Sequence, residues 1–159
     1  MAEFLIREAS DDDGPTLARL MSEARADEGE ALDPPDGEAF ERPASFFEER
    51  GGRLWVVMRD DMAAGSLGLI AHGRPKEFEL SMICLDMEAR GQGLAAALLA
   101  GANAFALASG GERLSVWVDV RFEDLHRFCE RHGFIREPGT RARHDGSDAL
   151  ECRFSRAVA

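Results

Sequence analysis

The sequence contains no tyrosine, only three cysteines, and no segment that we expect to span a membrane. Cys84, Cys129 and Cys152 are odd in number and far apart, which argues against a disulfide framework and suits a reducing compartment. The N-terminal residues include Glu3 and Arg7 and lack the apolar core of a signal peptide. We therefore expect a cytoplasmic protein that does not enter a membrane.

Basic side chains are in the minority. The chain has 19 Lys and Arg against 30 Asp and Glu, a formal charge of −11. Such a surface repels nucleic acid and anionic lipid, whereas it attracts cationic amines at low salt. The 159 residues contain no linker or repeat, so we expect residues 1–159 to form one domain.

Two common catalytic motifs are missing. No G-x-x-x-x-G-K-[ST] segment occurs, which excludes a P-loop, and no G-x-S-x-G segment occurs, which excludes the nucleophile elbow of a serine hydrolase.

The hydrophobic periodicity changes along the chain and predicts both strands and helices. The predicted strands are residues 4–6, 54–58, 65–71, 78–85, 114–118, 134–135 and 149–154. One helix is predicted after Ser10–Asp13, and a short helix is predicted to end at Arg50. Two further helices are predicted at residues 92–109 and 122–132. Residues 28–43 are broken by proline and glycine and form a candidate mobile substrate loop. The strand, helix and strand of residues 78–118 form a crossover unit, so the sheet should be mixed and the fold α+β.

The segment Arg90–Ala95, R-G-Q-G-L-A, lies where a predicted strand gives way to a helix. Glycines at such a junction let backbone N–H groups approach a ligand where the helix presents unpaired donors and a partial positive charge. With the guanidinium of Arg90 beside them, these donors favour a phosphate or pyrophosphate. Two alternatives are a simple tight turn and a dinucleotide site of the G-x-G-x-x-A type, with Asp119 on a ribose. The dinucleotide site fits less well, because residues 86–90 separate the strand from the first glycine.

Leu85–Ala95 is similar to the acyl-CoA signature of the GNAT family of N-acetyltransferases, in which a strand and a short acidic turn lead through a glycine-rich segment into a helix. Phe128–Phe134, F-C-E-R-H-G-F, resembles the end of a later helix of that family. The order of elements agrees from residue 4 to residue 154. The resemblance implies a GNAT-like α+β fold, with a mixed, mostly antiparallel sheet flanked by helices.

The resemblance also implies an activity, the transfer of an acetyl group from acetyl-CoA to a primary amine by direct attack in a ternary complex. The acceptor would be a small-molecule amine or a basic peptide, no metal is involved, and a second copy of the chain is a candidate partner. Main-chain groups of Ile83 and Leu85 would pair with the pantetheine arm. The residues implied around the pyrophosphate are Arg90, Gly91, Gln92, Gly93, Leu94 and Ala95.

Glu79 is the first candidate for the base that removes the proton of the amine. Strict alternation from Phe78 would place Glu79, Ser81, Ile83 and Leu85 on one face of the strand, pointing Glu79 toward the acetyl site. An acid near the start of a strand is also commonly just solvated, and an ordinary glutamate is a weak base for an ammonium.

Cys129 stands where the family commonly carries the tyrosine proposed to protonate the departing thiolate. Its thiol is a candidate donor, but its apolar neighbours Leu125 and Phe128 favour a packed core thiol. A chain that lost its acid could instead be a non-catalytic acyl-CoA-binding sensor. His126, Cys129 and His132 recur every three residues, but the sequence shows no fourth ligand and we expect no metal site.

Overall fold

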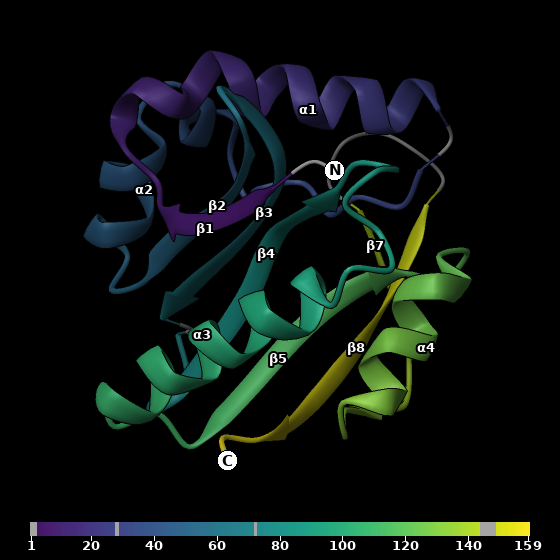
Figure 1. Cartoon of the computed structure of the whole chain (residues 1–159). Helices are drawn as coiled ribbons and strands as arrows, with labels where there is room; N and C mark the ends of the chain where they lie inside the picture. Colours follow the sequence, from purple (N-terminus) through teal and green to yellow (C-terminus); the bar gives the residue numbers. More distant parts are fainter. Residues whose placement is uncertain (1–2, 28, 72, 144–148) are drawn as a thin grey trace.

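One mixed sheet with helices on both faces makes up the fold (Figure 1). The computed structural model describes residues 3–27, 29–71, 73–143 and 149–159. The strands are β1 (Phe4–Glu8), β2 (Arg53–Arg59), β3 (Met62–Ala71), β4 (Glu77–Leu85), β5 (Arg113–Asp119), β6 (Ile135–Arg136), β7 (Arg141–Ala142) and β8 (Leu150–Ala157). The helices are η1 (Asp11–Asp13), α1 (Gly14–Ala26), η2 (Gly37–Phe40), α2 (Pro43–Glu49), α3 (Leu94–Ala108) and α4 (Glu123–Arg131), where η marks a 3-10 helix.

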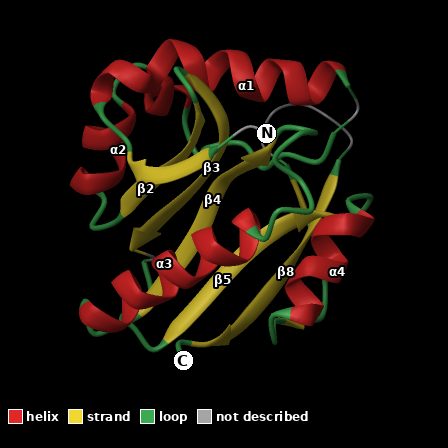
Figure 2. Ribbon diagram, viewed as in Figure 1, coloured by secondary structure: helices red, strands yellow, loops and turns green. Residues whose placement is uncertain are grey.

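The strand order confirms the mixed, mostly antiparallel sheet. It runs β1-β2-β3-β4-β5-β8-β6, with β7 also paired to β8. Among the described strand pairs, β4 and β5 run parallel and the others antiparallel, because α3 carries the chain across one face between them (Figure 2). The β4–β5 pairing extends only to Leu80 opposite Val116. Beyond that level the two strands separate.

Two hydrophobic cores lie on opposite faces of the sheet. Alternate residues of β2 show this directly, since Leu54 and Val56 join the core beneath α1 and α2, whereas Val57 joins the core beneath α3 and α4. In Figures 1 and 2, α3 and α4 lie in front of β5 and β8. Burial on both faces explains the long apolar runs of the central strands.

A β-bulge in β4 changes which side chains share a face. Ser66 of β3 pairs with Cys84 and Gly68 pairs with Ser81, so β4 carries one residue more than β3 over this stretch. The extra residue is accommodated at Met82, whose φ is +49°. Accordingly Leu80 lies in the core beneath α3, whereas Met82 lies in the core beneath α1.

The bulge corrects the prediction of a single face carrying Glu79, Ser81, Ile83 and Leu85. Ile83 and Leu85 pack against the core beneath α3 and α4, the same core that holds Phe78 and Leu80. Glu79 and Ser81 alternate with Phe78 and Leu80 and therefore lie on the opposite face. The prediction was wrong because strict alternation holds only while the strand pairing is regular.

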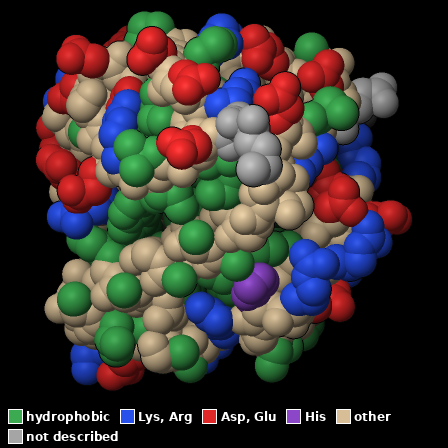
Figure 3. All heavy atoms as spheres, viewed as in Figure 1, with side chains coloured by type: hydrophobic (Ala, Val, Ile, Leu, Met, Phe, Trp, Pro, Cys, Tyr) green, Lys and Arg blue, Asp and Glu red, His purple; other side chains and the backbone are tan. Residues whose placement is uncertain are grey.

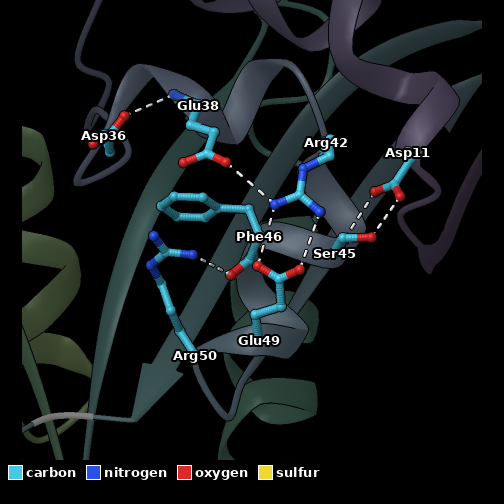
Figure 4. Close-up of polar contacts among 8 residues, drawn as sticks. All are labelled: Asp11, Asp36, Glu38, Arg42, Ser45, Phe46, Glu49 and Arg50. Carbon is cyan, nitrogen blue, oxygen red and sulfur yellow. Dashed lines mark hydrogen bonds and ion pairs between the residues drawn. The ribbon is translucent and has the colours of Figure 1, made fainter.

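Residue 28 lies outside the described residues, and residues 29–43 contain the irregular segment and the start of the short helix that the sequence predicts. Figure 4 shows how polar contacts hold the end of this stretch and α2 in place. Asp36 caps η2 by accepting the N–H of Glu38 at 2.8 Å, and Arg42 donates to Glu38 at 3.2 Å and to Glu49 at 3.0 Å. At the start of α2, Ser45 donates its N–H to Asp11 at 2.8 Å.

The surface shown in Figure 3 carries mixed charges over α1 and a hollow lined by hydrophobic side chains beside α3. Within the described ranges, no helix has both the length and the apolar character needed to cross a bilayer.

Candidate active site

The turn between β4 and α3 is anchored by Asp86. One carboxylate oxygen accepts the N–H of Ala89 at 2.9 Å, and the other accepts Arg59 at 2.8 Å. The N–H of Asp86 itself donates to the carbonyl of Ala64 at 2.8 Å. Ala89 is fully buried, whereas the next residues, Arg90–Gly93, are exposed. The base of the turn is therefore fixed and its rim is open to a ligand.

The rim of this turn ends in two glycines with left-handed backbone. Gly91 has φ +74° and Gly93 has φ +76°, values that other residues adopt only with strain. A Cβ built on either glycine would meet nothing within 4 Å, so open space lies over both. Gly93 is the N-cap of α3, and no side chain caps this end of the helix. The first N–H groups of α3 therefore face an open turn, which is the arrangement that binds phosphate groups.

Arginine side chains flank the same turn. Arg90 donates through Nε to the carbonyl of Leu85 at 3.3 Å, and its two terminal nitrogens bond no residue that the structure describes. Arg131, at the end of α4, lines the same space. Two guanidinium groups thus lie at the edge of an N–H-rich turn.

From the turn, an apolar cavity of about 260 Å³ extends between α3 and α4, and we call it the α3–α4 groove. Its walls combine hydrophobic side chains of β3, β4, α3 and α4 with the two arginines and with the carboxylates of Glu30 and Asp124. The larger hydrophobic lining residues are Leu67, Ile83, Leu85, Leu98, Leu125 and Phe128. A groove of this composition suits a long, mostly apolar ligand with a charged head at the turn.

The inner end of the α3–α4 groove lies where β4 and β5 have separated. At this level the segment that follows α1 takes the place of a neighbouring strand. Leu32 donates its N–H to the carbonyl of Ile83 at 2.8 Å, and Met82 donates its N–H to the carbonyl of Asp33 at 3.4 Å. The bulge and this segment together keep β4 apart from β5.

The same segment is fastened to α4 by Glu30. Its carboxylate accepts the N–H groups of Asp124 at 3.0 Å and Leu125 at 2.7 Å. These are two of the first donors of α4, which no side chain of the preceding residues caps. Glu30 therefore closes one side of the α3–α4 groove.

A second cavity, of about 300 Å³, lies next to the separated strands, and we call it the β4–β5 cavity. Its lining is more polar than that of the groove. The charged residues that line it are Asp33, Glu79, Asp119, Arg141, Arg143 and Glu151. Leu32 and Leu80 contribute to its inner wall.

Glu79 and Ser81 line this second cavity from β4. Glu79 is half-buried, and Ser81 retains only 8% of its exposure. The Ser81 hydroxyl is buried and has no hydrogen-bond partner within the described residues. A buried hydroxyl without a partner is costly unless a ligand or water satisfies it.

Most charges around the β4–β5 cavity are already paired. Asp119 is almost fully buried and accepts two hydrogen bonds from the guanidinium of Arg121, at 3.0 and 2.8 Å, and one from the Arg121 backbone N–H at 2.9 Å; these bonds hold the pKa of this carboxyl below its ordinary value. Asp33 accepts bonds from Arg143, at 2.6 Å, and from Arg25. Asp119 is thus a structural ion pair rather than an exposed ligand for a ribose.

Cys129 is in the core and lines neither cavity. It is 4% exposed, and burial raises the pKa of its thiol to about 12. Leu125 and Phe128 of the same helix face the α3–α4 groove. The structure therefore places Cys129 in the packed core, away from the lining of both cavities.

His126 and His132 do not converge with Cys129 either. Nε2 of His126 lies 3.0 Å from the carbonyl of Asp119, whereas His132 packs on the ring of Phe128 at 4.5 Å between centroids. In the described part of the chain, no three His, Cys, Asp or Glu side chains are grouped as metal ligands.

The result of comparison with known proteins is consistent with the glycine turn, the uncapped start of α3 and the separation of β4 from β5. Residues 17–134 match the acetyltransferase (GNAT) family. The chain belongs to this GNAT family of acetyltransferases. A search of curated protein sequences gives no match. Membership confirms the resemblance carried by Leu85–Ala95, and the dinucleotide-binding fold is excluded.

Solved GNAT structures share the whole fold. A GNAT acetyltransferase from Staphylococcus aureus Mu50 superposes with a TM-score of 0.81 at 16% identity, covering 99% of this chain and 100% of that one. The Salmonella typhimurium protein yncA, solved with acetyl-CoA, gives 0.74 at 15% identity, covering 98% and 94%. RimL, a ribosomal L7/L12 alpha-N-protein acetyltransferase solved with coenzyme A, gives 0.75 at 19% identity, with the same coverage. At these identities the likeness shows the fold alone.

Several residues around the GNAT site were not singled out by the sequence analysis. Glu30 and Leu32 come from the irregular segment after α1, and Trp117, Arg141 and Glu151 come from three different strands. No local motif marks them, because only the packing of distant segments brings them to the cavities.

Proposed function

We propose that this GNAT protein transfers the acetyl group of acetyl-CoA to a primary amine, by direct attack while both substrates are bound. The observation that carries the proposal is the open turn with left-handed Gly91 and Gly93 before the uncapped α3, at the mouth of an apolar groove. Acetyl-CoA supplies an activated thioester when bound. Backbone N–H groups from Gly91 to Ala95, together with Arg90, are assigned to its pyrophosphate.

Strand β4 is assigned to the pantetheine arm. Its separation from β5 beyond Leu80 leaves an edge that residues 32–33 cover at Met82 and Ile83, and within the described residues the carbonyl of Leu85 accepts only the 3.3 Å bond from Arg90. Because the carbonyl of Ile83 already accepts the N–H of Leu32, the N–H of Ile83 and the main-chain groups of Leu85 are assigned to pair with the arm as a neighbouring strand would. A main-chain N–H at this edge would also polarise the reacting carbonyl.

The acceptor amine is assigned to the β4–β5 cavity, with Glu79 as the base. A neutral amine is required for attack, and Glu79 is the carboxylate of β4 in that cavity. Because the bulge turns Glu79 away from the face of Ile83, proton transfer is expected to pass through water or through the Ser81 hydroxyl. The proposal includes no side-chain acid, since Cys129 stays in the core, so breaking the C–S bond releases a thiolate that takes its proton from water.

Thiol release and thermal stabilisation test the proposal together. We expect coenzyme A to raise the unfolding temperature of the purified chain, and free thiol to appear from acetyl-CoA only when an acceptor amine is present. Mass spectrometry of the acceptor should show one added acetyl group. Stabilisation without thiol release on any amine would favour the acyl-CoA-binding sensor. No stabilisation by coenzyme A would refute the proposed binding site.

A further inference from the structure

We infer that the acceptor is an amine that also carries an anionic group, a carboxylate or phosphonate, and that Arg141 binds this group in the β4–β5 cavity. The inference rests on the proposed acetyl transfer and names the acceptor class for the same site.

Arg141 is hydrogen-bonded through one edge of its guanidinium group, and the other edge has no partner among the described residues. Its Nε donates to Glu151 at 3.1 Å, and its guanidinium carbon lies 3.9 Å from the ring centroid of Trp117. Its two terminal nitrogens donate to no residue that the structure describes. A guanidinium fixed in this way presents two parallel N–H groups, the geometry that binds a carboxylate or phosphonate by two hydrogen bonds.

The contacts with Trp117 and Glu151 orient the arginine before a ligand arrives. Stacking on an indole ring stabilises a cation, and the carboxylate of Glu151, whose side chain is only 16% exposed, fixes the direction of the planar group. Less side-chain freedom is then lost when an anion binds. The Arg141 side chain keeps 45% of its exposure, so an anion can reach it.

The other cations near the cavity are already bonded at their terminal nitrogens. Arg143 donates through Nη2 to Asp33 at 2.6 Å, and Arg121 places Nε and Nη2 on the two oxygens of Asp119. Both arginines are therefore held in ion pairs with carboxylates of the cavity. Arg141 differs because it uses only Nε.

The β4 residues that line the cavity suit an amine. Glu79 supplies a carboxylate, and the buried hydroxyl of Ser81 has no partner in the described structure. An acceptor that spans the cavity would place its amino group at β4 and its anion at Arg141 on β7. Because the cavity measures about 300 Å³, at the lower end of the range for ligand sites, the acceptor is a small zwitterion of amino-acid type.

A polycation fits this lining less well. The acidic surface attracts polyamines in general, but three of the cavity's carboxylates, Asp33, Asp119 and Glu151, already accept bonds from arginines. The ammonium groups of a polycation would compete with these arginines for the carboxylates. The paired lining therefore favours an acceptor with one charge of each sign.

The test compares acceptors that differ only in the anion. L-amino acids would be assayed against their amides, and aminoalkylphosphonates against the corresponding alkylamines, with spermidine as the polycation. The variants are Arg141→Gln, Arg141→Lys and the control Arg136→Gln, an exposed arginine on β6 that does not line the cavity. We expect kcat/KM to be at least about 10-fold higher for the anionic acceptors.

Arg141→Gln should raise KM for the anionic acceptors by about 10- to 100-fold and leave kcat/KM for the amides unchanged. The KM of Arg141→Lys for the anionic acceptors should lie between those of the wild type and Arg141→Gln, because lysine keeps the positive charge but lacks the paired N–H groups of a guanidinium. Stabilisation by coenzyme A should be unchanged in all three variants.

Several outcomes overturn the inference. The inference is wrong if amides or spermidine are acetylated as efficiently as the anionic acceptors, or if Arg141→Gln affects both acceptor types equally. It is also wrong if no anionic acceptor is turned over. If coenzyme A still stabilises the chain and another amine is acetylated, the proposed function stands and only the acceptor class is wrong. If coenzyme A does not stabilise the wild-type chain, the proposed function itself fails.

Discussion

Leu32 and Ile83 are joined by a 2.8 Å hydrogen bond between the main-chain N–H of the first and the carbonyl of the second. Leu32 lines the β4–β5 cavity, whereas Ile83 lines the α3–α4 groove. The bond therefore stands at the boundary between the two spaces that we assign to the acceptor and to acetyl-CoA. Contacts that hold the segment after α1 should affect this boundary.

Glu30→Ala tests how that segment is held. We expect a loss of about 0.5–2 kcal/mol in the free energy of unfolding, because two N–H groups of α4 lose their acceptor. Hydrogen exchange of the Asp124 and Leu125 amides should become faster. Glu41→Ala, at an exposed glutamate outside both cavities, is the control. Unchanged exchange at the start of α4 would show that Glu30 does not cap this helix in solution.

Gly93→Val tests the glycine turn. A β-branched residue at φ +76° is strained by roughly 1–2 kcal/mol, and its side chain would fill the open space in front of α3. We expect the affinity for coenzyme A, measured by calorimetry, to fall by at least about 10-fold. Gly101→Ala, within α3 and with equally open surroundings, should bind normally. Normal binding by Gly93→Val would place the diphosphate elsewhere.

Glu79→Gln tests the assigned base. Removing a general base lowers kcat by about 10²- to 10⁴-fold, and the rise of kcat with pH on the acid side should disappear. KM for acetyl-CoA should not change, since Glu79 lies outside the α3–α4 groove. Glu112→Gln, at an exposed glutamate paired with Lys76, serves as the control. A kcat within a factor of two of wild type would show that Glu79 is not the base.

The three thiols should be unreactive in the native chain. Burial raises the pKa of Cys84 to about 11, of Cys129 to about 12, and of Cys152 above its ordinary value. Because the thiolate is the reacting form, a disulfide reagent at pH 8 should label the folded protein slowly and the unfolded protein at all three sites. Rapid labelling of Cys129 in the native state would make its thiol a candidate proton donor again.

Asp13→Asn tests a pH-dependent ion pair. Both oxygens of Asp13 accept Arg7 nitrogens at 2.8 Å, and these hydrogen bonds hold the pKa of Asp13 below its ordinary value of 3.8. A carboxyl with a lowered pKa stabilises the fold above its unfolded-state pKa and loses this contribution as pH falls through its folded-state pKa. The variant should lose about 1 kcal/mol at pH 7, a modest amount because Arg7 is partly exposed.

Urea unfolding at several pH values measures this difference, which should shrink below about pH 3.8. The exposed neighbour Asp12, changed to Asn, should show little loss at any pH. A difference between wild type and Asp13→Asn that stays constant down to pH 2 would contradict the assignment.

The sequence alone was sufficient to place the glycine turn. Two glycines between an apolar strand and an apolar helix are a local signal for an exposed turn, and in the structure Gly91 and Gly93 adopt the left-handed backbone that glycine tolerates. The predicted helix of residues 92–109 begins two residues later, at Leu94, because Gly93 is still left-handed. The antiparallel strands, the crossover and the mixed sheet were predicted for the same reason, since hydrophobic periodicity is set within each element.

Only the tertiary structure decided which side chains meet at the site. Pairing with β3 places a bulge at Met82, and this bulge separates the face of Glu79 from that of Ile83. The direction of Cys129 depends on how α4 packs against the sheet, and Arg141 reaches the cavity because β7 pairs with β8. Such positions depend on contacts between segments distant in the chain, and local sequence patterns carry no record of those contacts.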